Sequence, residues 1–254
     1  MTDYPANIVP VNHVEPVPRR VRAILADETV VDTTRARYVW EKPTYPQYYI
    51  PVEDVRPELL VAEQKAEQSS RGTAHVHGLQ VGGTHRPGGA RLLRESPIPG
   101  IANTVRFEWA ALDAWYEEDE QVFVHPRSPY TRVDALRSTR RVRIERDGTV
   151  LAESSAPVMV FETGLPTRYY INRTEVDFSH LIPSDTVTEC PYKGATGGYW
   201  SARVGGRIHR DVAWCYEFTT RQLLPIAGLI AFYNERTDVF LDGRELERPK
   251  THFA

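Results

Sequence analysis

The residues best suited to chemistry lie in one short stretch, residues 189–194, with the sequence Glu-Cys-Pro-Tyr-Lys-Gly. It places a thiol (Cys190), a phenol (Tyr192) and an amine (Lys193) within four residues. A nearby ammonium stabilises a thiolate, which is the reactive form of cysteine. The stretch therefore predicts a nucleophile, Cys190, assisted by Lys193. The alternatives are that Cys190 lines a ligand site without reacting, or is a small buried apolar residue before a turn.

Proline and glycine around these residues indicate a loop that leads into a strand. Pro191 biases Cys190 towards an extended conformation. Gly194 and the two glycines that follow it permit positive φ or a close backbone approach. Tyr199 and Trp200 come next, and we place them with Tyr192 among the candidate ligand-binding residues. Their alternative role is in the core, because the chain lacks the basic face of a nucleic-acid stacking platform.

A carboxylate and a phenol recur together in both halves of the chain. Glu162 and Tyr170 are expected on adjacent strands, as are Glu41 and Tyr49. Such a pair can orient a ligand or transfer protons, so Glu162, Arg168 and Tyr170 join the candidate ligand-binding residues. The alternative is a buried hydrogen-bonded pair that supports the turn between the strands.

A third group of ionisable side chains lies between the two halves, in residues 125–134. His125, Arg127, Tyr130 and Arg132 are candidates for a clamp on an anion, because guanidinium groups suit carboxylate and phosphate. The alternative is a linker held by its own salt bridges, for which Asp134 supplies a carboxylate.

The composition excludes some classes of binding partner. The chain has 254 residues, 41% hydrophobic and 26% charged, with a net charge of −3, so no strong field favours nucleic acid or an anionic membrane. Its most apolar run, residues 223–232, contains Pro225 and Gly228 and is too short to span a bilayer. The N-terminus has no basic-then-apolar signal pattern. We expect a cytoplasmic protein whose partner is a small molecule.

An internal repeat organises the chain. The sequence Arg-Arg-Val-Arg at residues 19–22 returns 121 residues later at 140–143. At this offset the first 42 columns contain 11 identities, where chance would give about 2 or 3. With small gaps, Gly72 aligns with Gly194 and Asp113 with Asp238. We infer a tandem duplication: an N-terminal extension (1–18), a first repeat (19–122), an inter-repeat segment (123–138) and a second repeat (139–254).

Each repeat has the pattern of short strands separated by turns, and no stretch keeps a helical period beyond about two turns. The fold class is therefore all-β and mostly antiparallel, with minor helix. Residues 64–89 of the first repeat, rich in Gly, Ser and His, are predicted to be the most mobile loop. In the second repeat we predict strands at 142–145, 149–152, 158–162, 168–171, 200–204, 212–218, 230–233 and 238–241, and one helical turn at 222–227.

Three motifs carry a family resemblance: residues 162–170 (Glu-Thr-Gly-Leu-Pro-Thr-Arg-Tyr-Tyr), residues 190–194, and the inter-repeat segment from His125 to Asp134. Together they resemble the tandem form of the domain-of-unknown-function 427 family, over about residues 19–245. The resemblance implies two β-tent-like domains, similar to Mss4-like proteins and B-type methionine-sulfoxide reductases. The Cys-Pro-Tyr-Lys-Gly motif is intact only in the second repeat, since the first has Gln68-Ser-Ser-Arg-Gly72.

That family also carries a nucleotidyltransferase label, which these residues do not support. Such chemistry needs metal-binding carboxylates and a phosphate-cradling Gly-Ser element, and the chain has no Gly-x-x-x-x-Gly-Lys loop. We expect a small-molecule-binding protein or thiol-dependent enzyme of unknown cofactor, with its site around Cys190. The alternatives are a non-catalytic metabolite-binding module and a scaffold, whose copies form a pseudo-dimer or assemble as a homo-oligomer.

Two cysteines, Cys190 and Cys215, make up the whole thiol content, and neither belongs to a Cys-x-x-Cys pair. Zinc-binding β-tent relatives use two such pairs, so we predict no structural zinc and no metal ligands. Elemental analysis of the purified protein should find zinc far below one atom per chain. Near-stoichiometric zinc that resists chelation would contradict this expectation.

Overall fold

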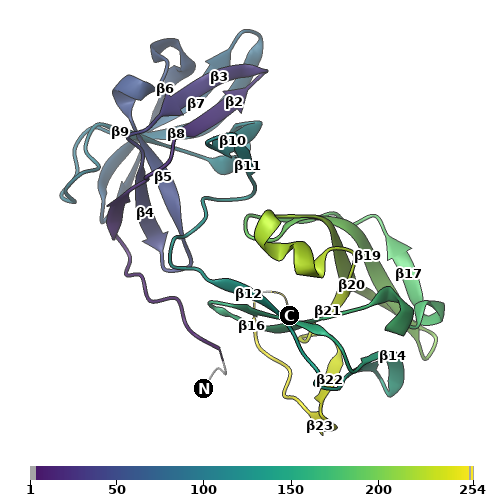
Figure 1. The fold of residues 1–254 in the computed structure, drawn as a ribbon. Helices are drawn as coiled ribbons and strands as arrows, with labels where there is room; N and C mark the ends of the chain where they lie inside the picture. Colours follow the sequence, from purple (N-terminus) through teal and green to yellow (C-terminus); the bar gives the residue numbers. More distant parts are fainter. Residues whose placement is uncertain (1–3, 252, 254) are drawn as a thin grey trace. The chain divides into compact units, whose positions relative to one another are not determined.

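The computed structural model describes residues 4–251 and 253. These residues form two compact units (Figure 1). Ile8–Tyr130 contains the first repeat, and the chain from Thr131 onward, together with the segment before Ile8, contains the second. Strands dominate both units and every described strand pairing is antiparallel, which confirms the all-β class.

The first repeat consists of a large and a small sheet. The large sheet has the order β1 (Val14–Pro16), β4 (Arg37–Lys42), β5 (Tyr45–Pro51), β9 (Thr104–Phe107), β8 (Thr84–Leu93), β7 (Gly72–Val81), β6 (Leu60–Ser69). The small sheet has the order β11 (Glu120–Val122), β10 (Ala114–Glu117), β2 (Val21–Leu25), β3 (Glu28–Thr33).

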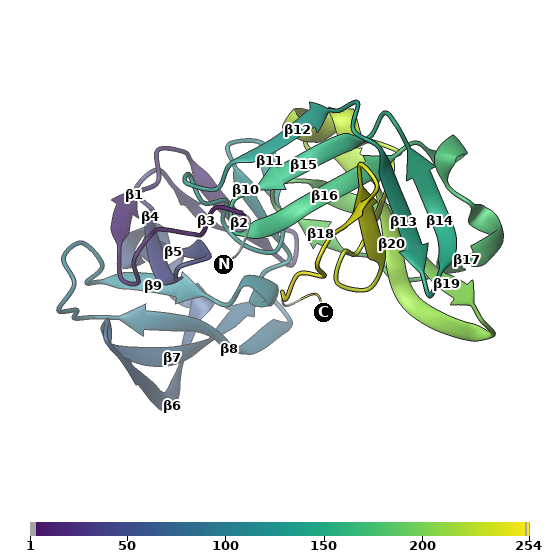
Figure 2. The same cartoon turned by 90° about the horizontal axis from the view of Figure 1, so that it is seen from below.

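The second repeat has the same two sheets, and Figure 2 shows β12, β15 and β16 in succession at one end of the large one. Its order is β12 (Val133–Arg137), β15 (Val158–Glu162), β16 (Leu165–Ile171), β21 (Ile230–Phe232), β20 (Arg207–Thr219), β19 (Gly194–Val204), β17 (Leu181–Ser184), and β18 (Glu189–Cys190) also pairs with β19. The small sheet has the order β14 (Thr149–Ser154), β13 (Val142–Arg146), β22 (Asp238–Leu241), β23 (Arg244–Glu245).

The strand orders of the two repeats correspond when the second small sheet is read in reverse, from β23 to β14, and when β17 and β18 together are matched to β6. This correspondence confirms the tandem duplication. The register makes the correspondence residue-specific. Tyr49 on β5 lies opposite Arg106 on β9, and Tyr170 on β16 lies opposite Ala231 on β21. Tyr49 and Tyr170 therefore occupy the same position of the repeat, and so do Arg106 and Ala231.

Alternation along the strands gives the large sheet an inner face, packed on the small sheet, and an outer face. In the second repeat Tyr169, Ile171 and Cys215 belong to the core between the sheets. Their neighbours Tyr170 and Trp214 belong to a separate cluster on the outer face. Successive strand residues point to opposite sides of a sheet, so this pattern assigns each side chain of β16 and β20 to one face.

Helical structure is limited to short 3-10 turns. They are η1 (Val52–Asp54), η2 (Pro57–Leu59), η3 (Trp109–Ala111), η4 (Arg173–Glu175), η5 (Phe178–His180) and η6 (Arg221–Ile226). Element η6 confirms the predicted helical turn and packs Leu223 and Ile226 on the outer face of the second repeat. Within the described part of the chain, no helix has the length and apolar character needed to cross a membrane.

The predicted loop at residues 64–89 is wrong. These residues continue through β6, β7 and β8, which turn at Gly82 and Gly83 between Val81 and Thr84. Much of β6 lies at an exposed sheet edge, where polar side chains are compatible with a strand. The polar residues of β6 therefore mark a solvated edge strand, and the histidines of this segment lie in β7 and β8 and not in a loop.

Gly194 is the glycine that fixes the local geometry around residue 193. Its φ is +105°, and a Cβ built on it would lie 2.0 Å from the Phe218 carbonyl oxygen. Gly72 corresponds to it, with φ +113° and a Cβ position 2.8 Å from the Glu95 carbonyl oxygen. In both repeats the residue before this glycine is a cation, Arg71 or Lys193, so the tight turn sets where the cation enters the sheet.

Gly194→Ala should destabilise the second repeat by about 3 kcal/mol or more, because the methyl group meets backbone and the φ is unfavourable. Gly148→Ala is the matched control, since Gly148 has φ +77° but open space around its Cβ position; it should cost about 1 kcal/mol. Both cysteines lie in the second repeat, so thiol exposure during urea unfolding reports this repeat alone. Equal losses in the two variants would contradict the steric explanation.

Candidate functional site

The outer face of the second repeat contains a buried ion pair. Glu162 is the last residue of β15, and Lys193 precedes Gly194 at the start of β19. The Lys193 Nζ donates to Glu162 Oε2, and the two side chains are 8% and 9% exposed. Burial opposes the charge on Lys193, but the Cys190 sulfur and the Glu162 carboxylate outweigh it and raise the pKa of Lys193. Lys193 is therefore a permanent ammonium at neutral pH.

The thiol of Cys190 lies beside this ammonium. Its Sγ is 3.9 Å from Lys193 Nζ, and the backbone pairing of Cys190 with Gly194 holds β18 against β19. Cys190 is partly exposed, whereas Lys193 is buried. The structure thus brings together the predicted nucleophile and its assisting cation, with the thiol as the more accessible of the two.

Aromatic side chains line the same face. Tyr170 is fully buried and packs edge-on against Trp214, with ring centroids 6.3 Å apart. Burial raises the pKa of Tyr170, and it likewise raises the pKa of Tyr216, to which the nearby Cys190 sulfur contributes. Tyr199 joins this face through a 2.9 Å hydrogen bond between its hydroxyl and that of Tyr233. Tyr170 and Tyr216 therefore stay neutral, and the ion pair at the centre of the site is formed by Lys193 and Glu162.

Arg168 forms a second ion pair on the outer face. Its two terminal nitrogens donate to the two oxygens of Glu235 at 2.7 and 2.8 Å. The guanidinium carbon also lies 5.8 Å from the Trp214 ring centroid and 5.6 Å from that of Tyr233. Burial opposes ionisation of Glu235, but Arg168 lowers the pKa of Glu235 below its usual range. Arg168 is thus committed to a partner that the sequence did not identify.

Trp200 lies on the other face of the sheet, in the inner core. Its ring centroid there is 5.8 Å from that of Phe178. Tyr192 is half-buried, and its carbonyl accepts a 2.6 Å hydrogen bond from Thr220. Tyr199 and Trp200 therefore separate, because alternate residues of β19 face opposite sides of the sheet.

The candidates of the inter-repeat segment divide between the two units. His125 stacks on Tyr45, with ring centroids 3.7 Å apart and planes at 7°, and Tyr130 donates its hydroxyl to Glu15. Arg127 lies 3.4 Å from the Glu117 carboxylate, all within the first unit. Arg132 belongs to the second unit, where its Nε donates to Asp134 at 2.7 Å. The structure pairs each of these cations locally, as in the salt-bridged alternative.

In the first repeat the carboxylate that corresponds to Glu162, Glu41, has different partners. Tyr49 donates its hydroxyl to Glu41 at 2.9 Å, as the recurring carboxylate–phenol pattern suggests. Arg106 binds Glu41 through two nitrogens, at 3.2 and 3.3 Å. In the second repeat Ala231 replaces Arg106, and Lys193 supplies the cation to Glu162. The sequence repeat did not reveal this difference, because Arg106 and Ala231 lie beyond the first 42 columns that align without gaps.

Several residues of the site escaped the sequence analysis. Glu235 lies 67 residues from Arg168, in a turn between strands, and its type alone suggests solvent. Tyr216 and Tyr233 were assigned to strands but not to a face. The alternation Trp214, Cys215, Tyr216 is the signal that could have placed Tyr216 beside Trp214. As for metals, the described residues contain no cluster of three or more His, Cys, Asp or Glu that could hold an ion.

Arg168→Met should destabilise the second repeat by about 3–5 kcal/mol at pH 7, because it leaves the Glu235 carboxylate buried without its cation. Arg132→Met is the control. Its side chain is 81% exposed and also paired with a carboxylate, so the stability should change little. Urea unfolding followed by thiol exposure measures both variants, and equal effects would contradict the assignment.

The pH dependence of this pair has a definite sign. The pKa of Glu235 is lower in the folded protein than its ordinary 4.5, so the pair stabilises fully above about pH 4.5 and less as the pH falls through the folded-state pKa. Arg168→Met removes the arginine that lowers this pKa and leaves burial opposed only by hydrogen bonds from Thr251 and the backbone, so the pKa of Glu235 rises. The deficit of the variant should therefore be larger at pH 7 than at pH 4. A deficit that grows at low pH would be inconsistent with an unpaired carboxylate.

A family model described as Domain of unknown function (DUF427) matches the chain twice, over residues 13–118 and 134–243. Each match covers most of one large and one small sheet, and the second includes Glu162, Cys190 and Lys193. No curated protein matches the chain. With most of its length matched, the chain belongs to the DUF427 family and carries this domain in two tandem copies.

Proposed function

We propose that the second repeat binds a small electrophilic molecule and that the Cys190 thiolate attacks it. The observation that carries the proposal is the buried ammonium of Lys193, held by Glu162 and 3.9 Å from the Sγ of a partly exposed thiol. An ammonium at this distance stabilises the negative charge of an attacking sulfur, and it does so more strongly in a partly desolvated site than in water.

Lys193 acts as a counter-ion in this proposal and not as a base. Its raised pKa keeps it protonated, so it cannot accept the thiol proton, which passes to solvent. The sulfur then forms a bond to the electrophilic atom of the ligand as the leaving group departs with its bonding electrons. Glu162 positions the ammonium, since an exposed lysine side chain would be mobile and screened by water.

Dithiol redox chemistry within the second repeat is less well supported than group transfer. Cys215 is fully buried in the core of the inner face, whereas Cys190 packs on the outer face. The two thiols thus lie on opposite sides of one sheet, and a disulfide needs Cβ atoms about 3.5–4.5 Å apart and facing each other. A single-thiol reaction requires no such rearrangement.

The proposal predicts that Cys190 is alkylated at least about tenfold faster than Cys215 by iodoacetamide in the native protein. Burial shields Cys215 and raises its pKa. Lys193→Met should slow Cys190 by about tenfold near neutral pH, whereas Lys193→Arg, which keeps the charge, should slow it less. Glu162→Gln should have the opposite effect, because the ammonium then no longer shares its field with a carboxylate.

The measurement is the pH–rate profile of each cysteine by peptide mass spectrometry. Cys215 serves as the folding control, since it stays unlabelled only while the second repeat is folded. If the ion pair were only structural, Lys193→Met and Glu162→Gln would both expose Cys190 and raise its alkylation rate. Equal rates for the two wild-type cysteines, or the same direction of change in both variants, would contradict the nucleophile and leave a non-catalytic binding module.

A further inference from the structure

The outer face of the first repeat has a cavity of about 130 Å³ where the second repeat has aromatic packing. A single ordered water needs only about 10–15 Å³, so the cavity has room for a small organic molecule. It lies wholly within one unit and is lined by Glu41, Tyr49, Glu67, Gln68, Ser69, Arg71, Ala74, Arg91, Leu93 and Arg106.

The register explains why this cavity exists in one repeat only. Arg91 lies opposite Arg106 on β9, just as Trp214 lies opposite Ala231 on β21. A tryptophan and an alanine have thus been replaced by two arginines, whose heads need polar partners and cannot close a dry core. The corresponding apolar cluster is much smaller here, with Tyr49 and Leu93 among its few buried members.

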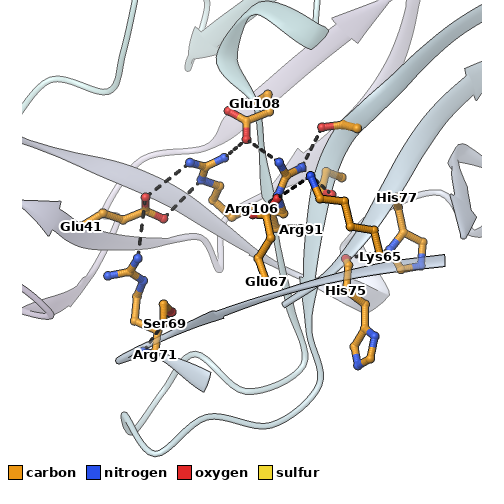
Figure 3. A network of polar contacts seen from close by, with 12 residues as sticks. Glu41, Lys65, Glu67, Ser69, Arg71, His75, His77, Arg91, Arg106 and Glu108 are labelled. Carbon is orange, nitrogen blue, oxygen red and sulfur yellow. Dashed lines mark hydrogen bonds and ion pairs between the residues drawn. The ribbon is translucent and has the colours of Figure 1, made fainter. Parts of the chain in front are cut away.

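Two of the three arginines are held in place by carboxylates (Figure 3). Arg106 lies between Glu41 and Glu108 and donates to both. The Nε of Arg91 donates to Glu67 at 2.7 Å, and one of its terminal nitrogens is 3.4 Å from Glu108. Burial opposes ionisation of Glu41, but Arg106, Tyr49 and Arg71 together lower its pKa. Glu41 therefore stays ionised at neutral pH.

Arg71 has the weakest contact with a carboxylate of the three arginines. One terminal nitrogen donates to Asn12 Oδ1 at 3.0 Å, while the other is 3.9 Å from Glu41 Oε2. That carboxylate already accepts hydrogen bonds from Arg106 and Tyr49. The side chain is only 16% exposed, so its guanidinium is largely desolvated beside the cavity. A ligand oxygen that accepts a hydrogen bond therefore adds more to the interactions of Arg71 than it would to those of Arg91 or Arg106.

We infer that this cavity binds a short-chain carboxylate, with Arg71 as the residue that receives the anion. A planar guanidinium matches a carboxylate in shape and charge. Glu41 and Glu67 line the same space, so a dianionic phosphate meets more repulsion there than a monoanion does. Ala74 and Leu93 provide an apolar wall for a few methylene groups. The site is independent of the thiol chemistry proposed for the second repeat.

Isothermal titration of the full chain with butyrate tests the inference. We expect saturable binding that weakens by about tenfold or more in Arg71→Gln, because a charged hydrogen-bonding partner is lost. Ala74→Leu fills the cavity without changing any charge and should weaken binding as well. This second variant keeps the test decisive if the loss of Arg71 also disturbs Asn12. Arg71→Lys should fall between wild type and Arg71→Gln.

Arg20→Gln is the matched control, since Arg20 is an exposed arginine paired with Asp32 in the same unit; it should bind butyrate as wild type does. Cys190→Ser should also bind normally, which separates this site from that of the second repeat. Inorganic phosphate and butyramide are the comparison probes, and both should bind more weakly than butyrate. No saturable heat, unchanged binding in Arg71→Gln and Ala74→Leu, or tighter binding of phosphate would each overturn the assignment.

Discussion

A carboxylate on the outer face of the large sheet, largely shielded from solvent, must be matched by a cation in each repeat. Glu162 is buried at this position and Glu41 is 21% exposed, and an unpaired charge at the buried position would cost several kcal/mol. The cation that follows β6 or β18 enters the sheet just before a glycine with positive φ, Gly72 or Gly194. The tight turn, the buried charge pair and the start of the next long strand therefore depend on one another, and the duplication has kept all three.

Around this shared element the two outer faces have diverged. In the second repeat Trp214, Tyr170 and the residues of η6 make an apolar face in which one lysine serves one carboxylate. In the first repeat Arg91 and Arg106 bring a network of carboxylates with them. The same fold thus supports a largely dry environment beside a thiol in one copy and a polar cavity in the other.

Local patterns were enough to predict the class, the duplication and many strands. The bounds of β15 and β22 match their predicted ranges, because alternating apolar residues between turn residues leave few alternatives. The approach of Lys193 to Cys190 was also predictable, since only two residues lie between them. Contacts between distant segments were not. The partners of Arg168 and Arg106 are 67 and 65 residues away, and only the sheet register brings them together.

The choice of lysine or arginine at this turn fits the shape and charge of the groups around it in each repeat. An ammonium is a compact charge that can lie close to a carboxylate and a sulfur at once, and Lys193 is paired in this way with Glu162 and Cys190. Where Gln68 replaces the cysteine, the cation is Arg71, whose planar fork can bind one partner while presenting further donors to another. The Gln68 amide itself exchanges hydrogen bonds with Thr73, which leaves the Arg71 guanidinium to Asn12 and Glu41. In the second repeat, exchanging Lys193 for arginine would keep the charge, but the larger planar head would no longer fit between Glu162 and Cys190.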